Sequence, residues 1–183
     1  MHLVTPAVEH LPSYIAALES GWSPDNRRPE AAAEELQEVA ADPVRFIAGQ
    51  CDPEGKGPPL KLPDGSAVPR LPGFHRWMWD GEFCGSIGAR WQPGTEELPP
   101  HCLGHIGYSV VPGKRRRGYA TRALGLLLPE LRPLGLRYVE LTTESSNAWS
   151  QRVIEANGGV RVGTFSKPDA HGGAESLRFR IML

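Results

Sequence analysis

The clearest hydrophobic pattern in the chain lies between Gly104 and Leu128, and it changes its period partway. From residue 105 to 111, β-branched Ile106 and Val110 flank the aromatic Tyr108, which is typical of a β-strand. Pro112-Gly113 then ends the strand, because proline has no backbone N–H to donate and glycine favours a turn. After Gly118 the apolar residues recur at helical spacing: Ala120, Ala123, Leu124, Leu127 and Leu128. This segment therefore predicts strand, turn and helix in direct succession.

The rest of the chain alternates between the two periods in a way that predicts one α/β domain over residues 1–183. The segment 49–73 is so rich in proline and glycine that it predicts a surface excursion without regular elements, either a lid or a tolerated insertion. The other predicted elements are a strand at 2–8, helices at 11–18 and 29–41, a hairpin of strands 74–79 and 82–91 about Asp80-Gly81, a strand at 135–143, a helix at 147–157, and strands at 160–165 and 176–183.

Composition narrows the class of protein. Of 183 residues, 40% are hydrophobic and 22% are charged, which is typical of a soluble globular domain. There is no apolar run of 18 residues and no signal-peptide pattern, so we expect a cytoplasmic protein that does not associate with membranes. Three cysteines without CxxC spacing argue against a disulfide framework. His101, Cys102 and His105 lie close in sequence, but no second cluster completes a tetrahedral set, so we expect no metal.

The predicted turn carries four consecutive basic residues, Lys114 to Arg117. A basic turn between a strand and a helix brings free backbone N–H groups and the positive end of a helix dipole together, which favours phosphate. The alternatives are a solvated basic surface or a nucleic-acid patch, and the formal net charge of -1 provides no general basic field for nucleic acid. The Walker and Rossmann glycine patterns are absent. The residues from Arg115 to Ala120 fit the pyrophosphate turn Arg/Gln-x-x-Gly-x-Gly/Ala.

At these residues the chain resembles the GNAT family, the GCN5-related N-acetyltransferases, and within it an uncharacterised branch of predicted acetyltransferases. Three stretches carry the resemblance, GHIGYSV from Gly104, RRRGYAT from Arg115 and IEANGG from Ile154, and the similarity covers roughly residues 103–160. The resemblance implies a single-domain α/β fold. Its mixed central sheet has about seven strands, splayed between strands four and five, and about four flanking helices.

The resemblance also implies acetyl-CoA as cosubstrate, without a metal. Backbone groups of the fourth strand would bind the pantetheine arm, the basic turn would hold the pyrophosphate, and the helix after strand five would present polar residues, of which Asn147 is also a candidate N-cap. The implied coenzyme-binding residues are Tyr108, Ser109, Val110, Arg115, Arg116, Arg117, Gly118, Tyr119, Ala120, Thr121, Asn147 and Ser150.

Candidate catalytic residues follow from the protons that acetyl transfer must move. His105 is the first candidate for the base, because an imidazole titrates near neutral pH, and Glu140, Glu144 and a water chain are its rivals. The resemblance implies a tyrosine acid seven residues after Asn147, but this position is Ile154. We therefore expect the hydroxyl of Tyr108 or Ser150, or solvent, to protonate the leaving thiolate.

The preferred interpretation is an N-acetyltransferase that moves an acetyl group from acetyl-CoA to a primary amine of a small molecule or peptide. A non-catalytic acyl-CoA sensor with the same fold is the main alternative, supported by the missing tyrosine. A nucleic-acid binder is disfavoured by the charge and by the absence of an aromatic platform. The acceptor and the oligomeric state, a homodimer included, stay open, because the loops 21–29, 49–73 and 92–100 carry no recognised motif.

Overall fold

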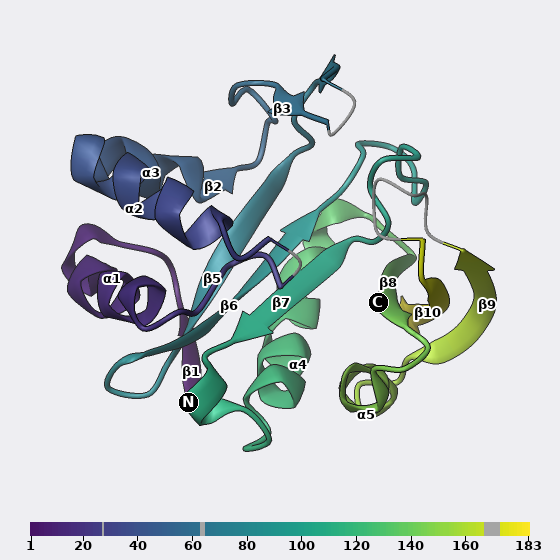
Figure 1. Ribbon diagram of the computed structural model, residues 1–183. Coiled ribbons are helices and arrows are strands. Elements are labelled where there is room, and N and C mark those ends of the chain that lie inside the picture. The colour runs from purple at the N-terminus through teal and green to yellow at the C-terminus, as the bar shows by residue number, and fades with distance from the viewer. Residues whose placement is uncertain (27, 63–64, 167–172) are drawn as a thin grey trace.

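The computed structural model of the protein describes residues 1–26, 28–62, 65–166 and 173–183 (Figure 1). The observed elements agree with the predicted order, with one added helix and several short strands. They are β1 (His2–Val4), α1 (Leu11–Glu19), α2 (Ala31–Ala41), α3 (Pro43–Gly49), β2 (Cys51–Asp52), β3 (Leu60–Lys61), β4 (Ala67–Val68), β5 (Gly73–Trp79), β6 (Phe83–Arg90), β7 (Ile106–Val110), α4 (Tyr119–Leu131), β8 (Tyr138–Glu144), α5 (Ala148–Glu155), β9 (Val160–Ser166) and β10 (Glu175–Met182), with 3-10 turns at Val8–His10, Pro112–Lys114 and Arg132–Leu134.

The expected mixed sheet takes the form of two ladders, and each pairing within them is antiparallel. One ladder has the order β1-β5-β6-β7, with β2 also on β5, and the other has the order β8-β10-β9. The two ladders meet at His105 and Glu140, where the backbone N–H of His105 donates to the Glu140 carbonyl at 2.7 Å. Beyond this contact β7 and β8 diverge, as Figure 1 shows. The predicted splay between the fourth and fifth main strands is therefore confirmed.

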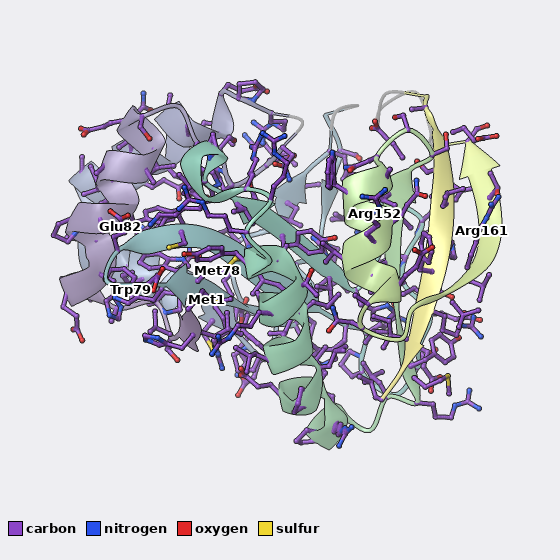
Figure 2. All side chains as sticks on the ribbon, turned by 90° about the horizontal axis from the view of Figure 1, so that it is seen from below. Met1, Met78, Trp79, Glu82, Arg152 and Arg161 are labelled. Carbon is purple, nitrogen blue, oxygen red and sulfur yellow. The ribbon has the colours of Figure 1, made fainter. Side chains whose placement is uncertain are left out.

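The ladder β1-β5-β6-β7 buries a different core on each face because side chains alternate along a strand. Trp77 of β5 packs against α1, α2 and α3 in a cluster that contains Tyr14, Trp22 and Phe83. Its neighbour Met78 faces the opposite way and joins the larger core beneath α4. Figure 2, seen from below, shows α4 between the part that carries Met78 and Glu82 and the part that carries Arg152 of α5 and Arg161 of β9. Helix α4 therefore packs where the two ladders separate.

Helix α4 forms where the apolar period predicted it. Ala123, Leu124, Leu127 and Leu131 are buried and form one face of the helix toward the core. Pro129 has no N–H to donate to the Gly125 carbonyl, and the helix ends two residues later, at Leu131. No helix among the described residues is long and apolar enough to cross a membrane.

Two local predictions need correction. The sequence pattern did not indicate α3, which begins after Asp42, whose carboxylate caps the N–H of Arg45 at 2.9 Å. The excursion 49–73 was expected to lack regular elements, but β2 pairs with β5, and β3 pairs with β4. Each of these three strands has two residues, which is short enough to fit between the prolines. Residues 63 and 64 lie outside the described ranges.

The aromatic core contains a titratable pair. The Tyr14 hydroxyl donates to Glu35 Oε2, which joins α1 to α2, and Tyr14 is buried. Burial raises the pKa of Glu35 to about 7, and the charges of Glu38 and Glu34 act in the same direction. The folded protein therefore keeps a proton on Glu35 over a pH range in which the unfolded chain has lost it.

Glu35→Gln is expected to flatten the pH dependence of stability between about pH 4.5 and 7. In this window the unfolded carboxyl loses its proton while the folded one keeps it, so wild-type stability falls as pH rises through the folded pKa. Glutamine has no proton to lose and still accepts the Tyr14 hydrogen bond. Thermal unfolding at pH 5 and pH 7.5 measures the difference, with Glu19→Gln on exposed α1 surface as the control. Parallel curves for wild type and Glu35→Gln contradict the assignment.

Candidate functional site

The turn before α4 adopts a backbone shape that glycine favours and that concentrates N–H groups. Gly118 has φ 77° and Arg116 has φ 60°, so two left-handed residues flank Arg117. The first hydrogen bond of α4 runs from the Arg122 N–H to the Gly118 carbonyl at 3.0 Å, and no side chain among the described residues caps the helix. The N–H groups of residues 119–121 therefore have no helical partner and lie at the positive end of the helix dipole.

A hollow of about 210 Å³ lies at this helix end and is lined by Met1, Arg117, Gly118, Tyr119 and Arg122. Two of its lining residues, Arg117 and Arg122, are arginines, and the N–H groups of residues 119–121 lie at the same helix end. Positive charge and N–H donors are the groups that bind a phosphate or pyrophosphate. We call the turn 115–121 together with this hollow the cradle.

The cradle is attached to the β5–β6 turn by contacts that the sequence analysis missed. The Lys114 ammonium pairs with Glu82 Oε1 at 2.6 Å, and the Tyr119 hydroxyl donates to Asp80 Oδ2. The Asp80 hydrogen bond also raises the pKa of Tyr119. The acidic residues on both sides of Gly81 are the only sequence signal for this attachment. The hairpin therefore holds the basic turn in place.

Strand β7 has one paired edge and one open edge. Val111 N–H donates to Cys84 O at 2.9 Å, and because backbone groups alternate along a strand, Ser109 also faces β6 while Tyr108 and Val110 face the open edge. Two side chains occupy carbonyls there: Asn26 Nδ2 donates to Tyr108 O at 3.1 Å, and Arg115 Nε donates to Val110 O at 3.0 Å. The open edge thus already accepts N–H donors, as expected for a strand that binds an amide chain.

The backbone of Ser109, one of the predicted coenzyme-binding residues, faces β6 and not the open edge. Ser109 is buried, and its hydroxyl lies 2.9 Å from Ser23 O and 3.0 Å from Asn26 Oδ1, so that one hydrogen is shared between them. Ser109 therefore connects β7 to the loop between α1 and α2. The Nε of Arg115, another predicted coenzyme-binding residue, donates to β7 at Val110 O.

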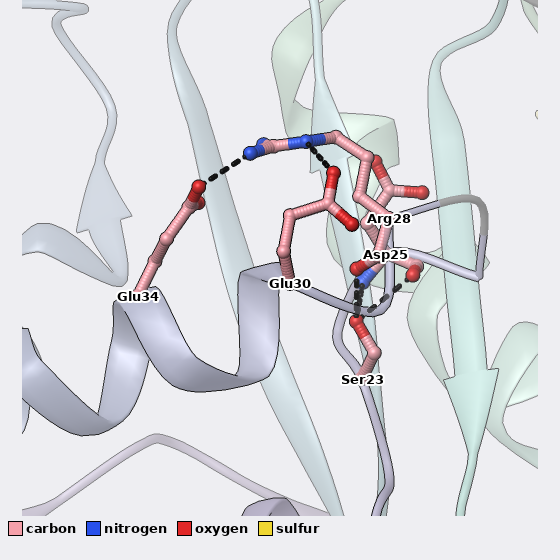
Figure 3. Close-up of polar contacts among 5 residues, drawn as sticks. All are labelled: Ser23, Asp25, Arg28, Glu30 and Glu34. Atoms are coloured by element: carbon pink, nitrogen blue, oxygen red, sulfur yellow. Dashed lines mark hydrogen bonds and ion pairs between the residues drawn. The ribbon is translucent and has the colours of Figure 1, made fainter.

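Described residues of the segment between α1 and α2 contact one another, as Figure 3 shows. Ser23 Oγ accepts from the Asp25 N–H at 3.3 Å and donates to Arg28 O at 2.7 Å. The Arg28 guanidinium bridges Glu30 at 3.2 Å and Glu34 at 2.6 Å. These exposed ion pairs are individually weak. Together with the Ser23 turn they hold Asn26 over the open edge of β7.

Tyr108 and Ser150 form a hydroxyl pair across the gap between β7 and α5. The two oxygens are 2.7 Å apart, and burial raises the pKa of Tyr108, so the phenol keeps its proton at neutral pH. Asn147 caps α5, with its Oδ1 accepting from the Ser150 N–H at 3.1 Å. Ile154 is 1% exposed and packs in the core. A hydroxyl on the β7 side therefore occupies the gap, and the helix position expected for a tyrosine is apolar.

His105 and Glu140 both have partners on the groups that a base would use. The His105 ring is 1% exposed, and its Nδ1 accepts from the Glu140 N–H at 2.9 Å. The Glu140 carboxylate binds Arg178 at 2.9 Å and Arg180 at 2.8 Å. Glu144, the third candidate, ends β8. Within the described ranges, no group of three or more histidine, cysteine or acidic side chains has the arrangement of a metal site.

Asn157 joins helices α4 and α5, a role that the sequence analysis did not predict. Its Nδ2 lies 3.1 Å from Thr121 O and 2.8 Å from Val153 O. A Cβ on Gly125 would lie 2.9 Å from Asn157 Oδ1, so glycine allows this close approach. The cradle at the start of α4 and the Ser150 hydroxyl on α5 are thereby held in one unit.

Comparisons with known proteins agree with this geometry. The sequence model of the Acetyltransferase (GNAT) family matches residues 41–158, which is well over half of the chain. A search of curated proteins finds no match.

Solved structures share the fold at low identity. The microcin C7 self-immunity acetyltransferase MccE, in complex with acetyl-CoA and AMP, has a TM-score of 0.65 at 10% identity, covering 99% of this chain and 91% of that chain. Mycobacterium smegmatis RimJ in complex with CoA-disulfide has a TM-score of 0.60 at 17% identity, covering 98% and 80%. The ribosomal L7/L12 α-N-protein acetyltransferase RimL in complex with coenzyme A has a TM-score of 0.61 at 12% identity, covering 99% and 93%.

The family match spans the open strand β7, the cradle and α5, and the whole fold agrees with that of solved acetyltransferases. The resemblance seen in the sequence is thus confirmed, and this chain belongs to the GNAT family of acetyltransferases.

Proposed function

We propose that the protein transfers the acetyl group of acetyl-CoA to a primary amine of a small molecule or peptide by direct attack. The observation that carries this proposal is the cradle beside the open edge of β7, where helix N–H groups without a helical partner lie next to a strand whose open-edge carbonyls accept hydrogen bonds. Solved relatives of the same fold are described as complexes with acetyl-CoA or coenzyme A, which supports the choice of ligand.

The chain's own residues fit the two ends of the coenzyme differently. The N–H groups of residues 119–121, with the side chains of Arg117 and Arg122, would hold the pyrophosphate. The open-edge groups of Tyr108 and Val110 would pair with the pantetheine amides, and Asn26 and Arg115 would give up the carbonyls that they occupy. One open-edge N–H would also face the developing oxyanion, in the position where a fixed donor stabilises it.

The hydroxyl pair supplies the acid that the helix lacks. The amine nitrogen attacks the thioester carbonyl carbon and forms the C–N bond. The C–S bond breaks, and its electron pair goes to sulfur, which takes the proton of the Tyr108 hydroxyl. Ser150, 2.7 Å away, returns a proton to the tyrosinate from solvent. The amine's proton leaves to water, since the lone pairs of His105 and Glu140 are engaged with other groups.

We further propose that residues 1–183 work as one domain in the cytoplasm, where acetyl-CoA is available. The three cysteines are free thiols, which is usual in a reducing compartment. Resemblance to enzymes that acetylate ribosomal protein N-termini and to one that confers microcin immunity keeps both peptide and small-molecule amines in the proposal. A non-catalytic acyl-CoA sensor is the second candidate, because Ile154 is buried where the family resemblance implies an acid.

Calorimetric titration with acetyl-CoA and with free CoA, followed by thiol release in the presence of amines, tests the proposal. The N-acetyltransferase is supported by saturable binding of both ligands and by thiol release that depends on an added amine. Binding without release for primary amines, polyamines and N-terminal peptides favours the sensor. If neither ligand binds, both candidates are wrong.

Tyr108→Phe is expected to lower kcat by at least tenfold and to leave the Kd for acetyl-CoA within about twofold. A general acid usually raises the rate by about 10²–10⁴-fold. Water can also protonate a leaving thiolate whose thiol has a pKa near 8.5, so we expect the loss of kcat to be as small as about tenfold. Steady-state kinetics and titration measure the two constants. Tyr138→Phe, on β8 beneath Arg180, is the control. An unchanged kcat for Tyr108→Phe removes the hydroxyl from the mechanism.

A further inference from the structure

The two ladders are joined by one residue that contacts both. The backbone carbonyl of His105 accepts from the Arg90 N–H of β6 at 2.9 Å. Its backbone N–H donates to the Glu140 carbonyl of β8 at 2.7 Å. In a regular strand both groups of a residue point to the same neighbour, so the chain is twisted at this residue. The strand that leaves His105 can therefore pair with β6 while moving away from β8.

The side chain of His105 completes the joint. Its Nδ1 accepts from the Glu140 N–H at 2.9 Å, so the imidazole nitrogen takes the place of a backbone carbonyl as the hydrogen-bond acceptor. The backbones are close here, since a Cβ on Gly104 would lie 3.1 Å from Glu140 O. Without this acceptor, a backbone N–H at the narrow end of the gap would be left without its protein partner, which destabilises a folded structure.

We infer that His105 is a positioning residue that fixes the angle between β7 and β8, and not the base of the reaction. The joint lies three residues before Tyr108, whose backbone faces the open edge and whose hydroxyl reaches Ser150. A change at His105 therefore alters the width of the gap in which both the pantetheine arm and the leaving sulfur are proposed to lie. Only the activity readouts below rest on the proposed function.

Burial of the ring agrees with a neutral imidazole that carries its hydrogen on Nε2. Burial lowers the pKa of His105, and Arg90 on β6 acts in the same direction, whereas Glu140 on β8 and Glu96 in the loop after β6 oppose it. Nε2 is buried and has no hydrogen-bond partner among the described residues. Protonation of Nδ1 would place two N–H groups against each other at the joint, so the neutral form is the one that holds the ladders together.

His105→Asn and His105→Gln separate the positioning role from the base role. The asparagine Oδ1 lies where Nδ1 does relative to Cβ and can accept from Glu140, whereas the glutamine amide extends to the position of Nε2. For a positioning residue, Asn keeps the Kd for acetyl-CoA and kcat within about fivefold of wild type. Gln then raises the Kd and lowers kcat, each by at least tenfold. For a base, Asn and Gln lower kcat equally, leave Kd unchanged and remove the acidic limb of the kcat/KM pH profile.

Amide hydrogen exchange at Glu140 tests the joint without any ligand. We expect the Glu140 N–H to be protected in wild type and in His105→Asn, and to exchange at least tenfold faster in His105→Gln. Equal protection in all three proteins overturns the inference, as does an equal loss of kcat in both variants. Should the protein fail to bind acetyl-CoA, the proposed function is wrong while the exchange result still decides the role of His105.

Discussion

Gly118→Trp is expected to weaken acetyl-CoA binding by at least a hundredfold. Gly118 lines the hollow, and an added Cβ would meet no atom within 4 Å, so the indole would extend into the space in front of the helix N–H groups. Loss of several charge-assisted hydrogen bonds to the pyrophosphate accounts for an effect of this size. Calorimetric titration of the purified variant with acetyl-CoA measures it.

The matched control is Gly135→Trp, at the turn that follows the other end of α4. Gly135 has φ 76°, against 77° for Gly118, and its Cβ also meets nothing within 4 Å. Both substitutions place a side chain on a left-handed residue and carry a similar backbone strain. Gly135→Trp should therefore lose similar stability and bind acetyl-CoA normally. Equal affinity in the two variants would show that the ligand does not use the cradle.

The cradle could be predicted from the sequence because its determinants are local. Strand, turn and helix follow one another within 28 residues, from Gly104 to Leu131, and Gly118 has the left-handed φ for which glycine is suited. The hairpin about Asp80-Gly81 was predictable for the same reason, since Gly81 has φ 79° at the turn. Each of these features needs only neighbouring residues to specify it.

The missed features depend on residues far apart in the chain. The partners of Lys114, Ser109 and His105 are Glu82, Ser23 and Glu140, and periodicity cannot assign such pairs. The side chain of His105 in particular resembles a base by residue type alone. Its burial and its contact with a backbone N–H appear only once β7 and β8 are placed side by side. The contacts of the candidate catalytic residues were for this reason harder to predict than the backbone shape of the basic turn.

The aromatic core under α1 shows the same limit, because the sequence around Tyr14 and Trp22 does not indicate which rings they contact. Both are at most 2% exposed, and they pack edge to face with ring centroids 5.6 Å apart. Trp77 stacks on Tyr14 at 4.3 Å with an interplanar angle of 3°, and it meets Phe83 edge to face. These rings fill the space between the sheet and the helices, so they support the α1–α2 loop.

Trp77→Ala is expected to destabilise the fold by about 3–5 kcal/mol, the usual cost of deleting a large buried aromatic side chain. Trp77 is 0% exposed and lies at the centre of this cluster. For a chain of this length the loss corresponds to a fall in Tm of roughly 10 °C. Thermal and urea unfolding measure it.

Two further tryptophan variants make the Trp77→Ala result specific. Trp149→Ala, on α5 with its side chain 60% exposed, removes the same atoms from the surface and should change stability little. Trp77→Phe keeps a ring against Tyr14 and removes Nε1, which is buried without a partner among the described residues, so its cost should be well below that of alanine. A Trp77→Ala protein as stable as Trp149→Ala would contradict the packing. Because this core supports the loop that carries Asn26 over β7, Trp77→Ala should also weaken acetyl-CoA binding before the protein unfolds.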